Sequence, residues 1–141
     1  MRLRPRGQRR TELGASALEF ALVVPLLLFI VGGILNFGLA FSQKMALDNA
    51  VRETARAAAV NTGKTVSELQ TAGVTTFNDS SIARQGQNAT ITVGTCKNTA
   101  FGTPVAATGT FRSNFIFPWL LPGMPNNMQW SSRGEYVCEY S

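Results

Sequence analysis

Histidine is absent from this chain of 141 residues, and cysteine occurs only twice. Without histidine, neither a Cys–His nor a Ser–His catalytic pair can form, and no imidazole is available to a zinc ion. No nucleophile motif and no cluster of carboxylates replaces them. We therefore expect that the protein is not an enzyme and that it holds no metal and no cofactor. A membrane-tethered enzyme is the least supported alternative.

Charge is missing from a long stretch near the N-terminus. Residues 20–35 read FALVVPLLLFIVGGIL, and the mostly apolar stretch continues to Phe41. Crossing a bilayer takes about 20 residues, so this run predicts a transmembrane helix. Pro25 lies inside it and should bend or loosen the helix locally, which lipid-embedded helices tolerate.

The net charge of +5 resides almost entirely in front of that run. Residues 1–14 carry five arginines and one glutamate, which is +4, and this leaves +1 for all the rest. A basic flank beside an apolar helix is an orientation signal that stays on the cytoplasmic side. With no aromatic platform and no second basic patch, nucleic acid is not an expected partner.

The remaining chain predicts an α+β fold with one domain outside the membrane. We expect a basic leader peptide over 1–14, and a transmembrane helix over 15–60 that continues into a soluble helix. A small extracytoplasmic head should follow over 61–141. Alanine-rich sequence supports the second half of the long helix. Small residues recur there at every fourth position, which favours close packing on the protein's own sheet over packing on a partner: Gly38, Ser42, Ala46, Ala50, Thr54 and Ala58.

Within the head, one helix and three strands are predicted. Thr65 and Glu68 have the spacing of a capping box, which starts a helix running to about Phe77 and weakened by Gly73. Period-two patterns then predict an antiparallel sheet of about three strands. These patterns cover 88–95, 109–117 with Phe111, Phe115 and Phe117, and 128–140 with a bend at 131–134. The apolar Trp119, Leu120 and Leu121 lie in the last loop, where they pack on the sheet, form a contact patch or meet the membrane surface.

Cys96 and Cys138 both lie beyond the membrane segment. With the N-terminus inside the cell, both would stand in an oxidising compartment, which favours a disulfide. Two buried free thiols acting as small hydrophobes are the alternative.

Gly14 and Glu19 stand between the basic leader and the apolar run. Glycine has no side chain, which suits entry of an extended backbone into a protease cleft. A lone carboxylate at bilayer depth costs about 2.5–3.5 kcal/mol, so Glu19 requires a partner from elsewhere. The alternative is a plain flexible glycine and an interfacial glutamate solvated beside the leader arginines.

The segment GASALEFALVVPLLLF resembles the class III signal of type IV prepilins. In that family a prepilin peptidase cuts after the glycine and leaves glutamate as the fifth mature residue, which here means cleavage between Gly14 and Ala15. The wider pattern is similar to the TadE-like pseudopilins of the tight-adherence (Flp) pilus system. It comprises Glu-Phe-Ala, a proline in the helix and, later, the stretch NAVRETARAA at 49–58. One departure is Asn36, in a region where relatives often hold an acid.

The resemblance implies a minor pilin or pseudopilin with a pilin-like fold. It assigns Glu19 and Phe20 to assembly, with the carboxylate meeting the new amine of a neighbouring subunit. The implied partners are prepilin peptidase, other pilin or pseudopilin subunits, the inner-membrane assembly platform and the lipid bilayer. The implied location is the bacterial inner membrane in a single pass, with the N-terminus cytoplasmic and the head periplasmic, and a place in the pilus itself left open. An ordinary secreted or membrane-anchored protein, with a signal sequence cut near Ala40, is the alternative, although the apolar run is too long for a signal peptide.

Overall fold

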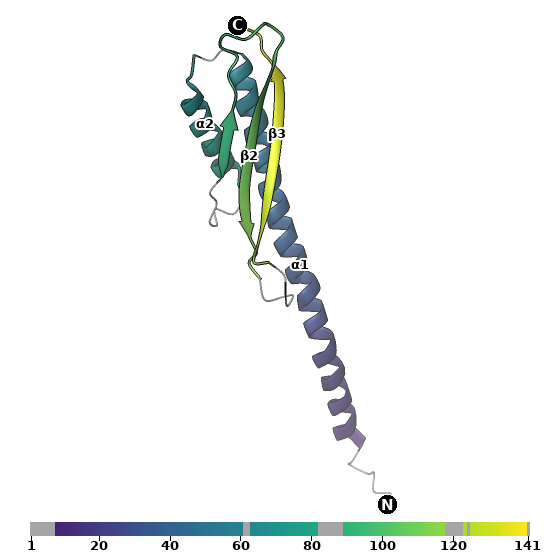
Figure 1. Cartoon of the computed structure of the whole chain (residues 1–141). Coiled ribbons are helices and arrows are strands. Elements are labelled where there is room, and N and C mark those ends of the chain that lie inside the picture. The colour runs from purple at the N-terminus through teal and green to yellow at the C-terminus, as the bar shows by residue number, and fades with distance from the viewer. Residues whose placement is uncertain (1–7, 61–62, 82–88, 118–122, 124, 141) are drawn as a thin grey trace, which may run out of the picture.

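The computed structural model describes residues 8–60, 63–81, 89–117, 123 and 125–140, with side chains from Gly14 onward. Two helices and three strands make up the described chain. They are α1 (Gln8–Ala59), α2 (Val66–Ser80), β1 (Thr90–Val93), β2 (Pro104–Asn114) and β3 (Asn127–Val137). A long α1 carries a small head on its C-terminal half, while its N-terminal half projects alone (Figure 1). The predicted α+β class, with a long apolar helix and a small antiparallel sheet, is confirmed.

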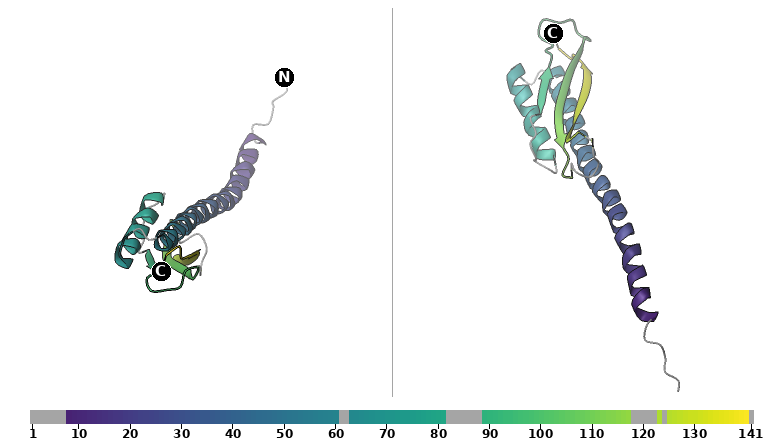
Figure 2. Two further views of the ribbon diagram at one scale, coloured as in Figure 1. Left: turned by 90° about the horizontal axis from the view of Figure 1, so that it is seen from above. Right: turned by 60° about the horizontal axis from the view of Figure 1, so that its bottom comes forward.

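Helix α1 begins earlier than the sequence predicted. It starts at Gln8, inside the expected leader, and not at Ala15. Arginine, glutamate and leucine are good helix formers, so the sequence ahead of Gly14 extends the helix without a break. Pro25 lies within α1, and the helix continues on both sides of it. Both views in Figure 2 show α1 as one continuous helix that enters the head, and the left view shows it curved.

The sheet has the strand order β1-β2-β3, and both neighbouring pairs are antiparallel. Both bounds of the second predicted strand, and the bend predicted in the third, were wrong. Strand β2 begins at Pro104 and ends at Asn114, so Phe115 and Phe117 lie beyond it. Strand β3 runs through 131–134 without the predicted bend, because these residues pair continuously with residues 107–110 of β2.

The core lies between the inner face of the sheet, α2 and the C-terminal half of α1. Phe77 of α2 and Phe111 of β2 are both buried there, with ring centroids 5.2 Å apart. The small residues of α1 from Ala46 to Ala58 face this core, as expected for packing on the protein's own sheet. The α1 residues in the core are Ala46, Leu47, Ala50, Val51, Ala55, Ala58 and Ala59.

Glycines let the elements approach closely. A Cβ atom at Gly134 of β3 would lie 3.2 Å from Cα of Arg52, and one at Gly109 of β2 would lie 2.6 Å from the Val51 side chain. Gly73 is buried in α2, where a Cβ would lie 2.3 Å from Oγ1 of Thr54. Gly73 is therefore a contact point between α2 and α1, whereas the sequence indicated only a weakness of the helix.

Helix α2 starts as the capping-box pattern predicted. Thr65 is the N-cap, its hydroxyl accepts from the backbone N–H of Glu68, and the Glu68 carboxylate accepts from the backbone N–H of Thr65. These hydrogen bonds, first the one from the Thr65 backbone, lower the pKa of Glu68. The helix ends at Ser80 and not near Phe77, while Trp119, Leu120 and Leu121 lie outside the described residues.

Candidate functional site

The residues singled out near the N-terminus all lie on the projecting half of α1. Gly14, Ala15, Glu19 and Phe20 are solvent-exposed, and Phe20 is 71% exposed. Gly14 is helical here, and a Cβ at this position would meet nothing within 4 Å. Entry of an extended backbone into a protease would therefore require the first turns of α1 to unwind.

Glu19 is the last charged residue before the apolar stretch of α1. From Phe20 to Gln43 the sequence contains no charged side chain, and Lys44 is the next one. Among the described side chains, none forms a hydrogen bond or an ion pair with the Glu19 carboxylate. The Glu19 side chain is therefore without a partner among the described side chains, which begin at Gly14.

The apolar stretch of α1 has the properties of a membrane span. Its most apolar window of 18 residues has a mean hydropathy of 2.5, and only 6% of that window is buried in the protein. A core helix of the same composition would be mostly covered by its own protein. The large side chains here are open to the surroundings instead, including Leu22, Leu26 and Ile30.

Asn36 fastens the head to the end of this apolar stretch. Its Oδ1 accepts hydrogen bonds from the backbone N–H groups of Ile116 at 3.0 Å and Phe117 at 3.1 Å. Its Nδ2 donates to the carbonyl oxygen of Phe117 at 3.3 Å. Asn36 is only 9% exposed, and all three bonds are partly buried.

Two further contacts strengthen the same junction. Oγ of Ser113 donates to Oε1 of Gln43 at 2.7 Å, and both side chains are buried. The rings of Phe37 and Phe115 lie 6.1 Å apart in a tilted arrangement. The end of β2 is thereby bound to α1 at two successive heights, by Asn36 and by Gln43. Sequence reasoning noted Asn36 only as a departure from the family pattern, because its partners are 80 and 81 residues away.

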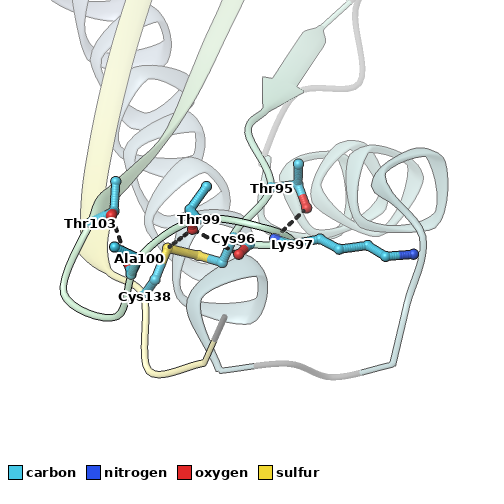
Figure 3. The surroundings of a disulfide bond; sticks show 7 residues. All are labelled: Thr95, Cys96, Lys97, Thr99, Ala100, Thr103 and Cys138. Carbon is cyan, nitrogen blue, oxygen red and sulfur yellow. Dashed lines mark hydrogen bonds between the residues drawn. A yellow bond between two sulfur atoms is a disulfide. The ribbon is translucent and has the colours of Figure 1, made fainter.

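The opposite end of the head is closed by the two cysteines. Cys96 and Cys138 form a disulfide with their Cα atoms 5.7 Å apart, and both residues are buried. Figure 3 shows Thr99 beside it: its Oγ1 donates to the carbonyl oxygen of Cys96 at 2.7 Å and contacts Sγ of Cys138 at 3.9 Å. The backbone N–H of Glu139 donates to the carbonyl oxygen of Ala59, so the C-terminal segment also caps the end of α1.

The described part of the chain thus contains one candidate membrane span, a long exposed helix and a small α+β head. Residues 14–56 match the family model TadE, described as TadE-like protein. The matched segment begins at Gly14 and covers most of α1, including Glu19, Asn36 and the stretch 49–58 as far as Arg56. Over this segment the resemblance to TadE-like proteins is confirmed. No curated protein and no solved structure matches the chain significantly.

Proposed function

We propose that this chain is a minor pilin or pseudopilin that takes part in assembling a tight-adherence pilus. In this proposal a prepilin peptidase removes the leader after Gly14, and α1 holds the protein in the bacterial inner membrane. The N-terminus faces the cytoplasm and the head faces the periplasm. The single observation that carries the proposal is the TadE match, which starts at Gly14 and extends through Glu19 and the apolar span.

The physical features of the chain support each part of this proposal. The leader arginines favour a cytoplasmic N-terminus. Cleavage would create an ammonium group at Ala15, and a pair between this group and Glu19 of a neighbouring subunit would neutralise two charges in a low dielectric. A disulfide in the head suits the oxidising periplasm. The family association makes other pilus subunits and the inner-membrane assembly platform the natural partners.

The N-terminus of the mature protein is the first test. Mass spectrometry of the membrane-extracted chain should find Ala15 as the first residue, and cells without prepilin peptidase should keep the whole leader. An intact leader in cells that contain the peptidase would refute the processing. A mature N-terminus near Ala40 would favour the alternative of an ordinary secreted protein.

The assembly role of Glu19 calls for a separate experiment. We expect Glu19→Gln to insert into the membrane normally and to co-purify less of the other pilus subunits, because the amide cannot pair as an anion with an ammonium group. Glu139→Gln is the matched control, since Glu139 is an exposed glutamate near the C-terminus, far from the span. Recovery of the subunits at wild-type level by Glu19→Gln would contradict the proposed role.

A further inference from the structure

Residues Phe115 to Phe117 form the tip of the head nearest to the apolar stretch of α1. The proposed function assigns this tip no role. This segment follows the end of β2 and lies beside Asn36 and Phe37 on α1. Ile116 is 43% exposed and Phe37 is 51% exposed, so an apolar surface is open at this junction. We propose that this tip docks into the lipid bilayer that α1 crosses, in the leaflet on the side of the head, and that Asn36 holds it there. The inference rests on the proposed function only in requiring that α1 spans a membrane.

The height of Asn36 on the helix supports this placement. At about 1.5 Å per residue, Asn36 lies about 24 Å along α1 from Phe20, the first residue after Glu19. The hydrocarbon core of a bilayer is about 30 Å thick, so with Glu19 at one boundary Asn36 does not reach the other. Tilting the helix places Asn36 deeper still. The chain segment bonded to Asn36 therefore lies at the level of the outer hydrocarbon or its headgroup boundary.

The backbone hydrogen bonds of the tip fit such an environment. Phe115 to Phe117 lie outside any strand, and yet each of their three N–H groups has a protein acceptor. The N–H of Phe115 donates to the carbonyl oxygen of Asn126 at 3.0 Å, and Asn36 accepts the other two. An irregular segment that faces water needs no such acceptors, whereas one at bilayer depth is tolerated only when its polar groups are satisfied. The amide of Asn36 is satisfied by the same bonds, which lets a polar side chain stay in an apolar setting.

The side chains of the tip favour lipid as the occupant. The described residues next to Asn36 on both elements are apolar: Phe37 on α1, and Phe115, Ile116 and Phe117 on the tip. None of them carries a charge that would select an acidic or basic partner. The apolar tip is also continuous with the exposed apolar surface of the span, so the bilayer that covers the span reaches the tip without a gap.

Lipid contact is measured with single tryptophan reporters in the full chain. Trp119 and Trp130, the only two tryptophans, are changed to phenylalanine, and the protein is placed in phosphatidylcholine vesicles that contain lipid brominated on the acyl chain. Ile116→Trp reports the tip, Leu27→Trp the span, and Phe101→Trp the far end of the head, where Phe101 is 77% exposed. We expect the tip and span reporters to lose emission and to be shifted to the blue. The Phe101 reporter should keep its emission and be quenched by iodide from the water.

The outcomes separate this inference from the proposed function. A quenched span reporter with an unquenched, iodide-accessible tip would overturn the docking and leave the anchor standing. A tip that resists both quenchers is covered by protein and not by lipid, which also overturns it. An unquenched span reporter would overturn the membrane anchor itself.

Asn36→Leu then tests the positioning role of Asn36. Loss of the three hydrogen bonds should release the tip, so that bromine quenching at position 116 falls while quenching at position 27 is unchanged. Asn49→Leu, at an exposed asparagine on the head half of α1, is the matched control and should change neither value. If quenching at position 116 stays the same in Asn36→Leu, then Asn36 does not hold the tip.

Discussion

Gly73→Ala should destabilise the head, although alanine is the better helix former. Gly73 is buried in α2, and a Cβ there would lie 2.3 Å from Oγ1 of Thr54 and 3.1 Å from Cδ1 of Ile91. The Thr54 hydroxyl cannot move aside freely, because it is buried and donates to the carbonyl oxygen of Ala50 at 2.7 Å. The Ile91 methyl is the flexible end of a side chain and can retreat by a few tenths of an ångström.

The size of the effect follows from two opposing contributions. Overpacking a core typically costs about 1–3 kcal/mol. Replacing glycine by alanine inside a helix stabilises by about 1 kcal/mol. We therefore expect Gly73→Ala to lower the free energy of unfolding by about 1 kcal/mol, which for a domain of this size is about 4–8 °C in Tm.

The sign of this effect should reverse when the clashing atom is removed. Thr54→Ala deletes Oγ1, so Gly73→Ala in that background should stabilise by up to about 1 kcal/mol, a coupling of about 2 kcal/mol between the two sites. The assay is urea unfolding of the full chain in detergent micelles, followed by near-ultraviolet circular dichroism of the head. Gly38→Ala is the control, since a Cβ there meets nothing within 4 Å, and it should not destabilise. Equal losses from Gly73→Ala in both backgrounds would refute the assignment of the clash to Thr54.

Three other measurements probe separate features of the head. Reduction of the Cys96–Cys138 disulfide, which closes a sequence separation of 42, should lower the free energy of unfolding by about 4 kcal/mol, and an unchanged urea midpoint would contradict a stabilising role. Thr65→Ala removes the N-cap of α2 and should cost about 1 kcal/mol in the same assay, whereas Thr71→Ala on the exposed face should be near neutral. Burial raises the pKa of Asp48, but hydrogen bonds from Lys44 and Ser132 and the charges of Lys44 and Arg52 lower it overall below 3.8. The stabilisation of the fold by ionised Asp48 is therefore fully present above the ordinary carboxyl pKa of 3.8. It is lost as the pH falls through the lowered pKa. Asp48→Asn should accordingly lose less stability than the wild type between about pH 5 and about pH 3, and parallel losses would contradict this.

Local patterns predicted those elements whose signals lie within a few residues. The capping box at Thr65 and Glu68 fixed the start of α2, and Ile91 and Val93 alternate with threonine as an inward-facing strand should. The start of β2 was missed because its first residues, Pro104 to Thr108, include a proline, two alanines and only one bulky apolar side chain, so they lack the alternation of a half-buried strand. These residues join the sheet through pairing with β3, which is a long-range contact that a local pattern does not contain.

The residues of the candidate site also fall into two groups, those that a local pattern reveals and those that only long-range contacts bring together. Gly14, Glu19 and the apolar run form one contiguous motif, so sequence alone located Glu19 and the run on the long helix, although it placed Gly14 ahead of that helix. The partners of Asn36 and Gln43 lie in the tip and in β2, far along the chain, and only the folded arrangement brings them together. The role of Gly73 was missed for a related reason. Helix propensity is a local property, whereas the need for glycine at position 73 arises from its contact with Thr54 on another helix.

The packing of the last strand on the first helix also determines when the protein can finish folding. Gly134 of β3 lies against Arg52, and the backbone N–H of Glu139 donates to the carbonyl oxygen of Ala59 at the end of α1. The last strand and the segment after it therefore pack on the first helix. Helix α1 leaves the ribosome first, and the strand that covers it leaves last. Until β3 has been synthesised, the part of α1 around Arg52 that it covers is therefore open to wrong partners. Correct folding thus requires either that β3 packs rapidly once it has been synthesised or that a factor shields this part of α1 until then.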